Sequence, residues 1–454
     1  MNTRNEELEN MPITQLIWKF STPAIIAMVT NALYNLVDTA VVGRGVGTLA
    51  IGGLAISFPI QMLALAGGQT VGIGAASIVS RNLGAGNDEK AYKTAGNSFA
   101  AALMLGIILG ALGLIFIDPI LLLFGATENI LPYAREYMQV IFIGFPFFSF
   151  AVSCNNIARA EGSPKVSMVS MIIGAGLNMI LDPIFVFGLN LGIRGAALAT
   201  IVSQIASFCF LVYYFTSGKS RLDIKLHHLI LDIKILMEMI AVGSASFVRQ
   251  AAGSILAIAL NNSLRIYGGD LYIAIFGVVN RVMMFMFMPM FGIVQGVQPI
   301  IGFNYGANKM LRVKEALYKS CAIITVMLTT SWLILQVFPG VIINIFSDDA
   351  KLIEKGIPIM RLMLMVIPIL GIQVVGATYF QAIGKAIPAM FLSMSRQIIF
   401  FVPLLLMLPV FWGLLGIWVA FPIADVLSAV VTVLWLTREI RRLDVKSVAC
   451  GARS

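Results

Sequence analysis

The sequence predicts an all-α integral membrane protein in which twelve transmembrane helices form two pseudo-twofold-related six-helix bundles. The first observation is composition: 59% of the 454 residues are hydrophobic and only 12% are charged, whereas soluble domains carry about 25% charged residues. The second is a succession of apolar segments long enough to cross a bilayer. The third is a spacing of glycine and proline residues that recurs in the two halves of the chain.

Twelve apolar segments reach the roughly 20 residues that a spanning helix requires. In chain order they cover residues 14–39, 50–77, 94–117, 134–158, 167–188, 193–215, 238–263, 270–300, 318–339, 357–380, 389–410 and 414–437. The longest polar insert, residues 217–234, is too short to fold alone. We therefore expect an N-terminal lobe at 1–216, a cytoplasmic linker at 217–236, a C-terminal lobe at 237–440 and a cytoplasmic tail at 441–454.

An internal repeat relates the two lobes. Gly84 follows the second span and Gly306 follows the eighth, 222 residues later. The same offset pairs further residues that are hard to replace because of their backbone conformations: Gly74 with Gly296, Pro146 with Pro368, and Gly162 with Gly384. Because each half has an even number of spans, both halves enter the membrane from the same side. The repeat therefore predicts a pseudo-twofold axis along the membrane normal, as in transporters with parallel repeats.

The net charge of +9 is explained by membrane topology. With the N-terminus inside, most Lys and Arg residues, including Arg396, fall on the cytoplasmic side, as the positive-inside rule requires. Residues 1–11 lack the basic region and short apolar core of a signal peptide. We expect a multi-pass monomer of the cytoplasmic membrane with both termini in the cytoplasm and no nucleic-acid partner.

Asp182 lies inside the fifth predicted span, and Asp38 lies late in the first. An ionised carboxylate is costly in hydrocarbon, so such residues indicate functional sites. Asn31 and Tyr34 precede Asp38 by seven and four residues and share its helical face. The alternative is that Asp38 caps a helix end or faces water near the outer interface.

A second helix and a third supply further oxygen atoms. Asn178 lies one turn before Asp182, and Thr200 lies seven residues into the next span. Carboxylate, amide and hydroxyl oxygens can hold Na⁺, and two interacting acids can instead share a proton. For Asp182, the alternative is a polar residue at a helix break before Pro183.

The two halves differ at the acids. At the 222-residue offset, Asp38 corresponds to Leu260 and Asp182 to Leu404. We therefore assign the ion site to the N-terminal half alone. The C-terminal half has no proline at the position equivalent to Pro23. Pro23 leaves a backbone carbonyl without its helical hydrogen bond, which indicates either a hinge or a static kink in the first span.

The C-terminal half has polar residues within its spans, but we expect no mid-span acid there. These residues could line a substrate cleft or satisfy one another: Arg249, Asn261, Asn262, Arg281, Gln295 and Gln298. The segment ending Gly218-Lys219-Ser220 lacks the first glycine of a phosphate-binding loop. We expect no nucleotide and no cofactor, and we interpret His227-His228 as a loop pair without an acidic partner.

Together these motifs resemble the multidrug and toxic compound extrusion (MATE) transporters over essentially the whole chain, most closely the prokaryotic branch named for DNA-damage-inducible transporters. The resemblance rests on Pro23 with Tyr34-Asn35-Leu-Val-Asp38, Asn82-Leu-Gly84-Ala-Gly86, Arg159-Ala-Glu161-Gly162-Ser-Pro164-Lys165, Leu177-Asn178-Met-Ile-Leu-Asp182-Pro183, and Gly195-Ala-Ala-Leu-Ala-Thr200.

The resemblance implies a non-enzymatic antiporter that exports amphipathic or cationic compounds in exchange for H⁺ or Na⁺. It implies that Asp38, Asn178, Asp182 and Thr200 form the cation site, which could hold Na⁺. The candidate substrate-binding residues are Asn31, Tyr34, Asn155, Asn156 and Arg281.

Two other functions stay open. A flippase for lipid-linked precursors has a similar helical plan, but its cleft should carry several Arg residues, and we place only Arg249 and Arg281 at mid-span. A membrane receptor or intramembrane enzyme agrees less well with the repeat, and no Ser/His/Asp or metal-ligand pattern occurs.

Overall fold

The computed structural model describes residues 3–451, and side chains from residue 6 to residue 443; within this range all regular structure is helical. The helices are α1 (Thr3–Asn10), α2 (Ile13–Gly45), α3 (Thr48–Gly84), α4 (Asp88–Ile115), α5 (Ile117–Leu123), α6 (Leu131–Ala160), α7 (Pro164–Pro183), α8 (Gly192–Thr216), α9 (Ile233–Tyr267), α10 (Asp270–Gly306), α11 (Met310–Val337), α12 (Pro339–Asn344), α13 (Ala350–Met363), α14 (Leu370–Ala382), α15 (Ala386–Met394), α16 (Val402–Trp412) and α17 (Leu414–Gly451).

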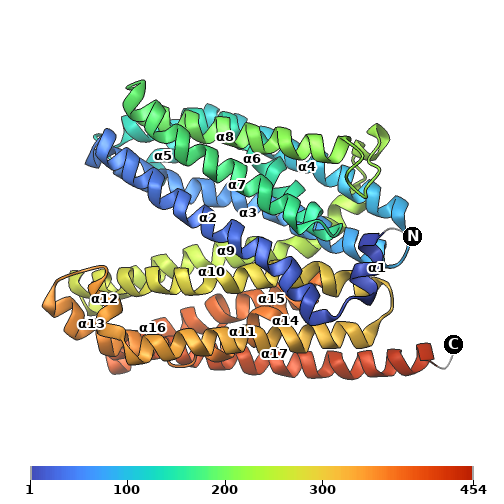
Figure 1. Ribbon diagram of the computed structural model, residues 1–454. Helices are drawn as coiled ribbons and strands as arrows, with labels where there is room; N and C mark the ends of the chain where they lie inside the picture. Colours follow the sequence, from blue (N-terminus) through green and yellow to red (C-terminus); the bar gives the residue numbers. More distant parts are fainter. Residues whose placement is uncertain (1–2, 452–454) are drawn as a thin grey trace.

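The predicted fold class is confirmed. Twelve helical stretches in the described part of the chain are long and apolar enough to cross a membrane, and each overlaps one predicted span. Helices α2 to α8 form one bundle and α9 to α17 the other, and the two termini lie at the same end of the molecule (Figure 1). Helix α17 continues the last span to Gly451, so the segment predicted as a tail begins inside a helix; residues 452–454 lie outside the described range.

Two of the spans contain a π-helical segment. Residues Ile184–Gly188 follow α7, and Ser395–Phe401 join α15 to α16. Pro183 directly precedes the first segment, and Pro403 lies two residues after the end of the second. Proline has no N–H for the carbonyl four residues earlier, so the hydrogen-bond register shifts. Such segments are frequent at functional sites, and each of these two adjoins or contains a charged residue described below.

Glycine contacts hold the two halves together. Helix α3 packs against α9 and α10, and α2 packs against α10. A Cβ on Gly306 would lie 1.9 Å from the carbonyl oxygen of Arg81, and a Cβ on Gly84 would lie 2.0 Å from that of Phe303. Arg81 and Phe303 are themselves 222 residues apart. The predicted repeat thus generates a symmetric pair of contacts in which helix backbones touch without an intervening side chain.

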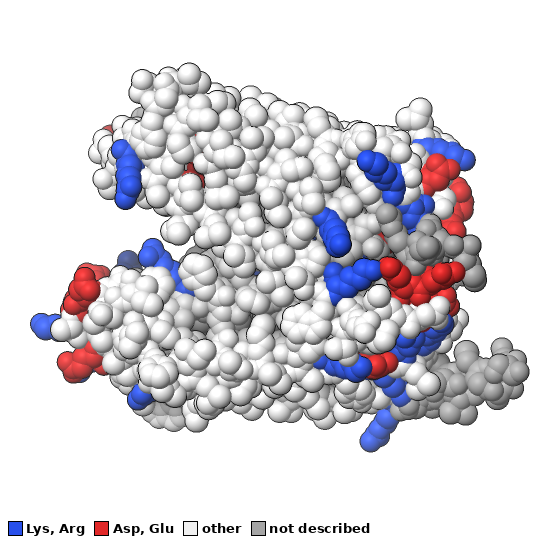
Figure 2. Space-filling model, viewed as in Figure 1, with Lys and Arg blue, Asp and Glu red and all other residues white. Residues whose placement is uncertain are grey.

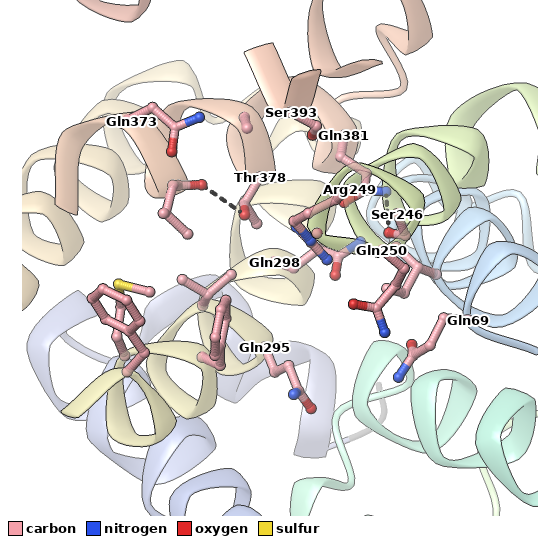
Figure 3. A pocket seen from close by; sticks show the side chains of 18 of the residues that line it. Gln69, Ser246, Arg249, Gln250, Gln295, Gln298, Gln373, Thr378, Gln381 and Ser393 are labelled. Atoms are coloured by element: carbon pink, nitrogen blue, oxygen red, sulfur yellow. Dashed lines mark hydrogen bonds between the residues drawn. The ribbon is translucent and has the colours of Figure 1, made fainter. Parts of the chain in front are cut away.

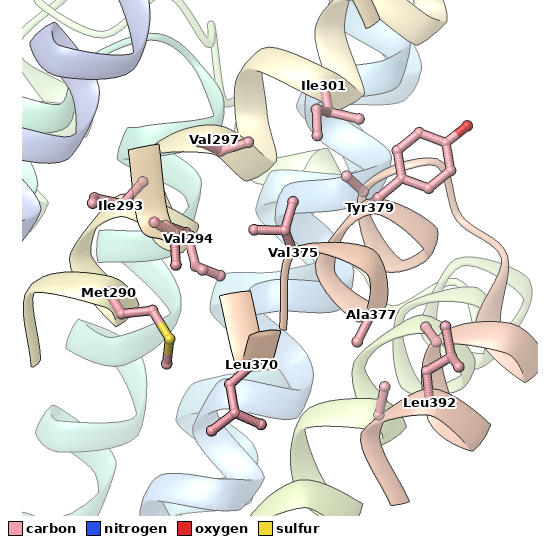
Figure 4. Packing of buried hydrophobic residues seen from close by; sticks show 14 of the residues in the cluster. Met290, Ile293, Val294, Val297, Ile301, Leu370, Val375, Ala377, Tyr379 and Leu392 are labelled. Atoms are coloured by element: carbon pink, nitrogen blue, oxygen red, sulfur yellow. The ribbon is translucent and has the colours of Figure 1, made fainter. Parts of the chain in front are cut away.

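The C-terminal half has an apolar core where α10 packs against α14. Figure 4 shows Met290, Val294 and Val297 of α10 facing the region of Leu370 and Val375 of α14. All five side chains are buried. This packing fixes the relative position of the two helices that supply much of the cavity wall described below.

The linker between the halves is docked on α4. Asn97 donates through Nδ2 to the carbonyl oxygens of His228 and Ile230, each at 3.0 Å, and its Oδ1 accepts the backbone N–H of Asp232 at 2.6 Å. Lys93 forms an ion pair with Asp232 at 2.7 Å. Hydrogen bonds from Lys93 and from the backbone hold the pKa of Asp232 below its usual range.

The prediction that the histidine pair has no acidic partner is wrong. Nε2 of His228 lies 3.0 Å from Oε1 of Glu89, and its Nδ1 accepts the backbone N–H of Lys225 at 3.0 Å. Because Nδ1 is an acceptor, Nε2 carries the proton and donates to Glu89. His227, Glu89 and His228 have side-chain atoms within 4.8 Å of one another, but both ring nitrogens of His228 already serve to fold the linker onto α4.

The glycine contacts generate the first prediction. Gly306→Ala places a methyl group against a backbone carbonyl that cannot move aside, and we expect a loss of about 1–3 kcal/mol or more of stability. Gly277→Ala in the same helix α10 is the matched control, because nothing lies within 4 Å of its added Cβ. Thermal unfolding in detergent measures both variants. Equal melting temperatures would contradict the close contact.

Candidate functional site

Three helices of the N-terminal half bring five predicted site residues together. Tyr34 and Asp38 lie on α2, Asn178 and Asp182 on α7, and Thr200 on α8; we call these five residues the acid cluster. Helix α7 packs against both α2 and α8. Asp38 is 7% exposed and Asp182 is fully buried. The alternative that Asp38 faces water at a helix end is therefore wrong.

The carboxyl groups of Asp38 and Asp182 lie within hydrogen-bonding reach of each other. A hydrogen bond between two carboxyl groups requires a proton between them. The Oδ1 atom of each has no hydrogen-bond partner among the described residues. Buried acceptors without partners are costly, so the pair has capacity for a proton or, with its neighbours, for a hard cation that prefers oxygen ligands.

The rest of the acid cluster orients these acids. The Asn178 amide bridges two helices when its nitrogen faces Asp182: it then donates to Oδ2 of Asp182 at 2.7 Å and accepts the backbone N–H of Thr200 at 3.1 Å. The opposite orientation leaves oxygen facing oxygen. The Tyr34 hydroxyl lies close to Thr200. These contacts connect α2, α7 and α8 at one level.

The other predicted site residues lie outside the acid cluster. Asn31 is exposed, as is Arg281. Asn156 donates to Oε1 of Gln69 at 3.2 Å, and its Oδ1 accepts from Arg159 at 2.8 Å. Asn155 is buried, and its Oδ1 has no partner among the described residues. Neither asparagine is hydrogen bonded to a member of the acid cluster in the described part of the chain.

A cavity of 340 Å³ lies between the two halves (Figure 3). Its walls come from α2 and α3 on one side and from α9, α10, α14 and the eleventh span on the other. Seven glutamines and an apolar wall that includes Phe287 and Met290 surround it. Two lining residues are charged, Arg249 and Arg396, and no carboxylate among residues 6–443 lines it. The volume is in the range of pockets that bind drug-sized molecules.

The expectation that the C-terminal half has no mid-span acid is wrong, and so is the cytoplasmic placement of Arg396. Arg396 lies in the π-helical segment, and its Nε donates to Oδ1 of Asp425 in α17 at 2.6 Å. Asp425 is 2% exposed. The guanidinium also lies 6.0 Å from the ring centroid of Phe287. Both residues lie within predicted spans, so the sequence showed each charge, but it could not show that the two side chains meet.

The sequence indicated three cavity residues, Arg249, Gln295 and Gln298, because they lie in predicted spans. It missed Gln69, Gln250 and the glutamines of α14. An uncharged amide within an apolar run gives a weak signal, and only its placement beside other amides shows that it lines a cavity. Arg281, predicted to bind substrate, does not line this cavity.

Two helical bundles related by a parallel repeat, with a polar cavity between them, define a membrane transporter. The family model MatE matches residues 23–184 and 245–407, one segment in each half. The chain belongs to the MATE family. It is accordingly a multidrug efflux transporter and not an enzyme, with small-molecule substrates and twelve membrane spans.

Relatives of known name support the family assignment along the full chain. The multidrug export protein MepA of Staphylococcus aureus strain MRSA252 is 26% identical over 445 residues, covering 98% of each chain. MepA of Staphylococcus haemolyticus strain JCSC1435 is 27% identical over 421 residues, covering 93% of this chain and 92% of that protein.

Solved structures of transporters have the same fold as this chain. A MATE transporter in the bent conformation matches with a TM-score of 0.93 at 26% identity, covering 99% of this chain and 100% of that one. A MOP superfamily transporter from Pyrococcus furiosus matches with a TM-score of 0.91 at 27% identity, covering 98% and 99%. The latter is described as having a binding pocket whose reverse polarity suggests a different function.

The buried ion pair generates the second prediction. Asp425→Asn leaves Arg396 without its carboxylate, and removal of one partner from a buried pair costs about 3–5 kcal/mol. The double variant Arg396→Met/Asp425→Leu should recover much of this loss. Thermal unfolding in detergent distinguishes the variants, with the exposed Asp348→Asn as the control. A single variant as stable as the control would show that the pair is energetically unimportant.

Proposed function

We propose that this transporter is an antiporter that exports amphipathic and cationic compounds in exchange for H⁺ or Na⁺, with residues 1–216 and 237–440 as its two moving lobes. Alternating access of the cavity between these lobes carries the substrate across. We place both termini in the cytoplasm of a cell whose cytoplasmic membrane holds the protein. The hollow between the lobes at the opposite end then faces outward (Figure 2).

The contact between Asp38 and Asp182 is the observation that carries this proposal. A buried acid pair that holds one proton can exchange it, or replace it with Na⁺, and either event changes the charge of the acid cluster. A cation drives transport only if it binds one conformation better than the other. The unpartnered Oδ1 atoms of both acids support cation binding in this conformation, because a bound cation would give these buried acceptors a partner.

Helix α2 is the element through which the acid cluster can act on the cavity. Its first part lies against glycines of α10: a Cβ on Gly296 would meet Ser21, and one on Gly292 would meet Ile25. Its second part packs on α7 and carries Asp38. Pro23 lies within the first contact and removes one helical hydrogen bond. Bending of α2 at Pro23 would therefore reposition the acid cluster relative to the other lobe.

The third prediction concerns the acids. Asp182→Asn keeps the side-chain size but removes the titratable charge, so gradient-driven efflux should fall at least tenfold; Asp38→Asn should behave alike. Proteoliposomes with separately imposed Na⁺ and pH gradients measure the rate and identify the coupling ion. Glu128→Gln, at an exposed acid, should transport normally. Efflux at the wild-type rate in both Asp variants would refute the coupling site.

The fourth prediction concerns the hinge. Pro23→Ala restores a backbone N–H for the carbonyl of Lys19 and should stiffen α2, lowering the efflux rate about fivefold while ligand affinity changes less than twofold. Pro59→Ala removes an exposed helical proline from α3 and is the control. Affinity in detergent and efflux in liposomes are measured on the same preparations. Loss of affinity at a normal efflux rate would make Pro23 a shaper of the cavity instead.

A further inference from the structure

We propose that Arg249 and Gln298, in the cavity between the halves, form a subsite that binds an anionic group of the transported molecule. The inference rests on the proposed export function and names the residues that select among its substrates. Both residues lie in the C-terminal half, outside the acid cluster.

Arg249 is the first observation. It lies in α9, lines the cavity, and forms no hydrogen bond or ion pair with any described residue. Its guanidinium has five N–H donors in a planar fork that matches a carboxylate. A charged residue within a membrane span without a partner is a functional-site candidate by default. Figure 3 shows Arg249 and Gln298 extending towards the same space from α9 and α10.

The balance of charge around the cavity is positive. Asp425 neutralises Arg396 across 2.6 Å, which leaves the charge of Arg249 uncompensated. Arg159 adds to it from behind Gln295 and Gln298, with which it borders a small adjoining void. The hydrogen-bond partners of Arg159 are neutral: Ser167 at 2.5 Å and Asn156 at 2.8 Å.

An unpartnered donor points to the same ligand chemistry. Gln298 is 8% exposed, and its Nε2 has no hydrogen-bond partner among the described residues. Buried amide donors are satisfied in most proteins. In contrast, Gln373 and Gln381 in the same wall donate to the carbonyl oxygens of Leu392 and Val242. Gln298 and Arg249 thus remain available to an acceptor-rich group.

The apolar wall defines the rest of the substrate. Phe287, Met290 and Phe291 line the cavity together with Met28 of α2. Aromatic and methionine side chains suit flat organic rings of varied shape. A substrate that places a carboxylate at Arg249 and rings along this wall satisfies both surfaces. A hollow lies between the two halves at the end of the molecule opposite the termini (Figure 2).

A matched pair of dyes tests the proposal. A rhodamine with a free carboxylate and its methyl ester share the same cationic ring system and differ in the anionic group. Binding to the purified full-length protein is measured by fluorescence anisotropy at neutral pH. We expect the free acid to bind wild type more tightly. Arg249→Gln should weaken its binding at least tenfold, about 1.4 kcal/mol, and change ester binding less than twofold.

Two further variants separate charge recognition from folding. Arg249→Lys keeps the charge and should retain most of the preference for the acid. Arg265→Gln, at an exposed arginine of the same helix, should change neither dye. Equal binding of acid and ester by wild type, or an equal loss of both in Arg249→Gln, would overturn the proposal.

Efflux assays separate this proposal from the general one. If neither dye is exported under any ion gradient while Arg249→Gln still selectively weakens binding of the acid, the antiport proposal fails and the anion site stands. If both dyes are exported equally by wild type and by Arg249→Gln, the anion site fails and export stands. Anionic phosphatidylglycerol added to the micelles should not displace the acid dye; displacement would assign the site to a lipid headgroup and overturn the small-molecule substrate.

Discussion

The close approach of α3 and α10 across the boundary between the halves is the constraint on which the rest of the structure depends. Gly84 and Gly306 each face a backbone carbonyl of the opposite helix, and only a residue without a Cβ permits that distance. Each of these helices also packs against the first helix of the other half, α9 or α2. The central set of four helices therefore belongs to both halves, and the cavity forms beside it.

The two halves stabilise their buried charged residues in different ways. In the N-terminal half, Asp38 and Asp182 lie together without a basic partner among the described residues, an arrangement that retains the capacity to take up a proton or another cation. In the C-terminal half, Arg396 and Asp425 neutralise each other across 2.6 Å, and such a pair is fixed rather than exchangeable. Arg249 is neither paired nor far from the substrate cavity. The internal repeat thus preserved the backbone contacts while the polar interiors diverged.

The sequence predicted the features that depend on local pattern or on the repeat. Apolar length located all twelve spans, and helical spacing placed Tyr34 and Asp38 on one face, which the acid cluster confirms. It could not predict side-chain contacts between elements that lie far apart in the sequence. Asp425 meets Arg396 through a π-helical segment that no spacing rule anticipates, and His228 meets Glu89 only because Asn97 folds the linker onto α4. The glutamines of the cavity wall come from separate helices, so no local pattern showed that they surround one space.

The acid cluster and the cavity are separate sites, so the proposed exchange of cation for substrate requires an element that contacts both. Helix α2 meets this condition, because Met28 lines the cavity and Asp38 belongs to the acid cluster. Ten residues separate them on one helix, which is about 15 Å of rise. In the proposed mechanism, a cation that enters the acid cluster can therefore alter the cavity by moving the part of α2 that follows Pro23 and carries both residues, without contacting the substrate. The acid cluster would bind a cation and the cavity an anionic group of the substrate. These preferences are compatible with exchange, because the two ligands do not compete for the same side chains.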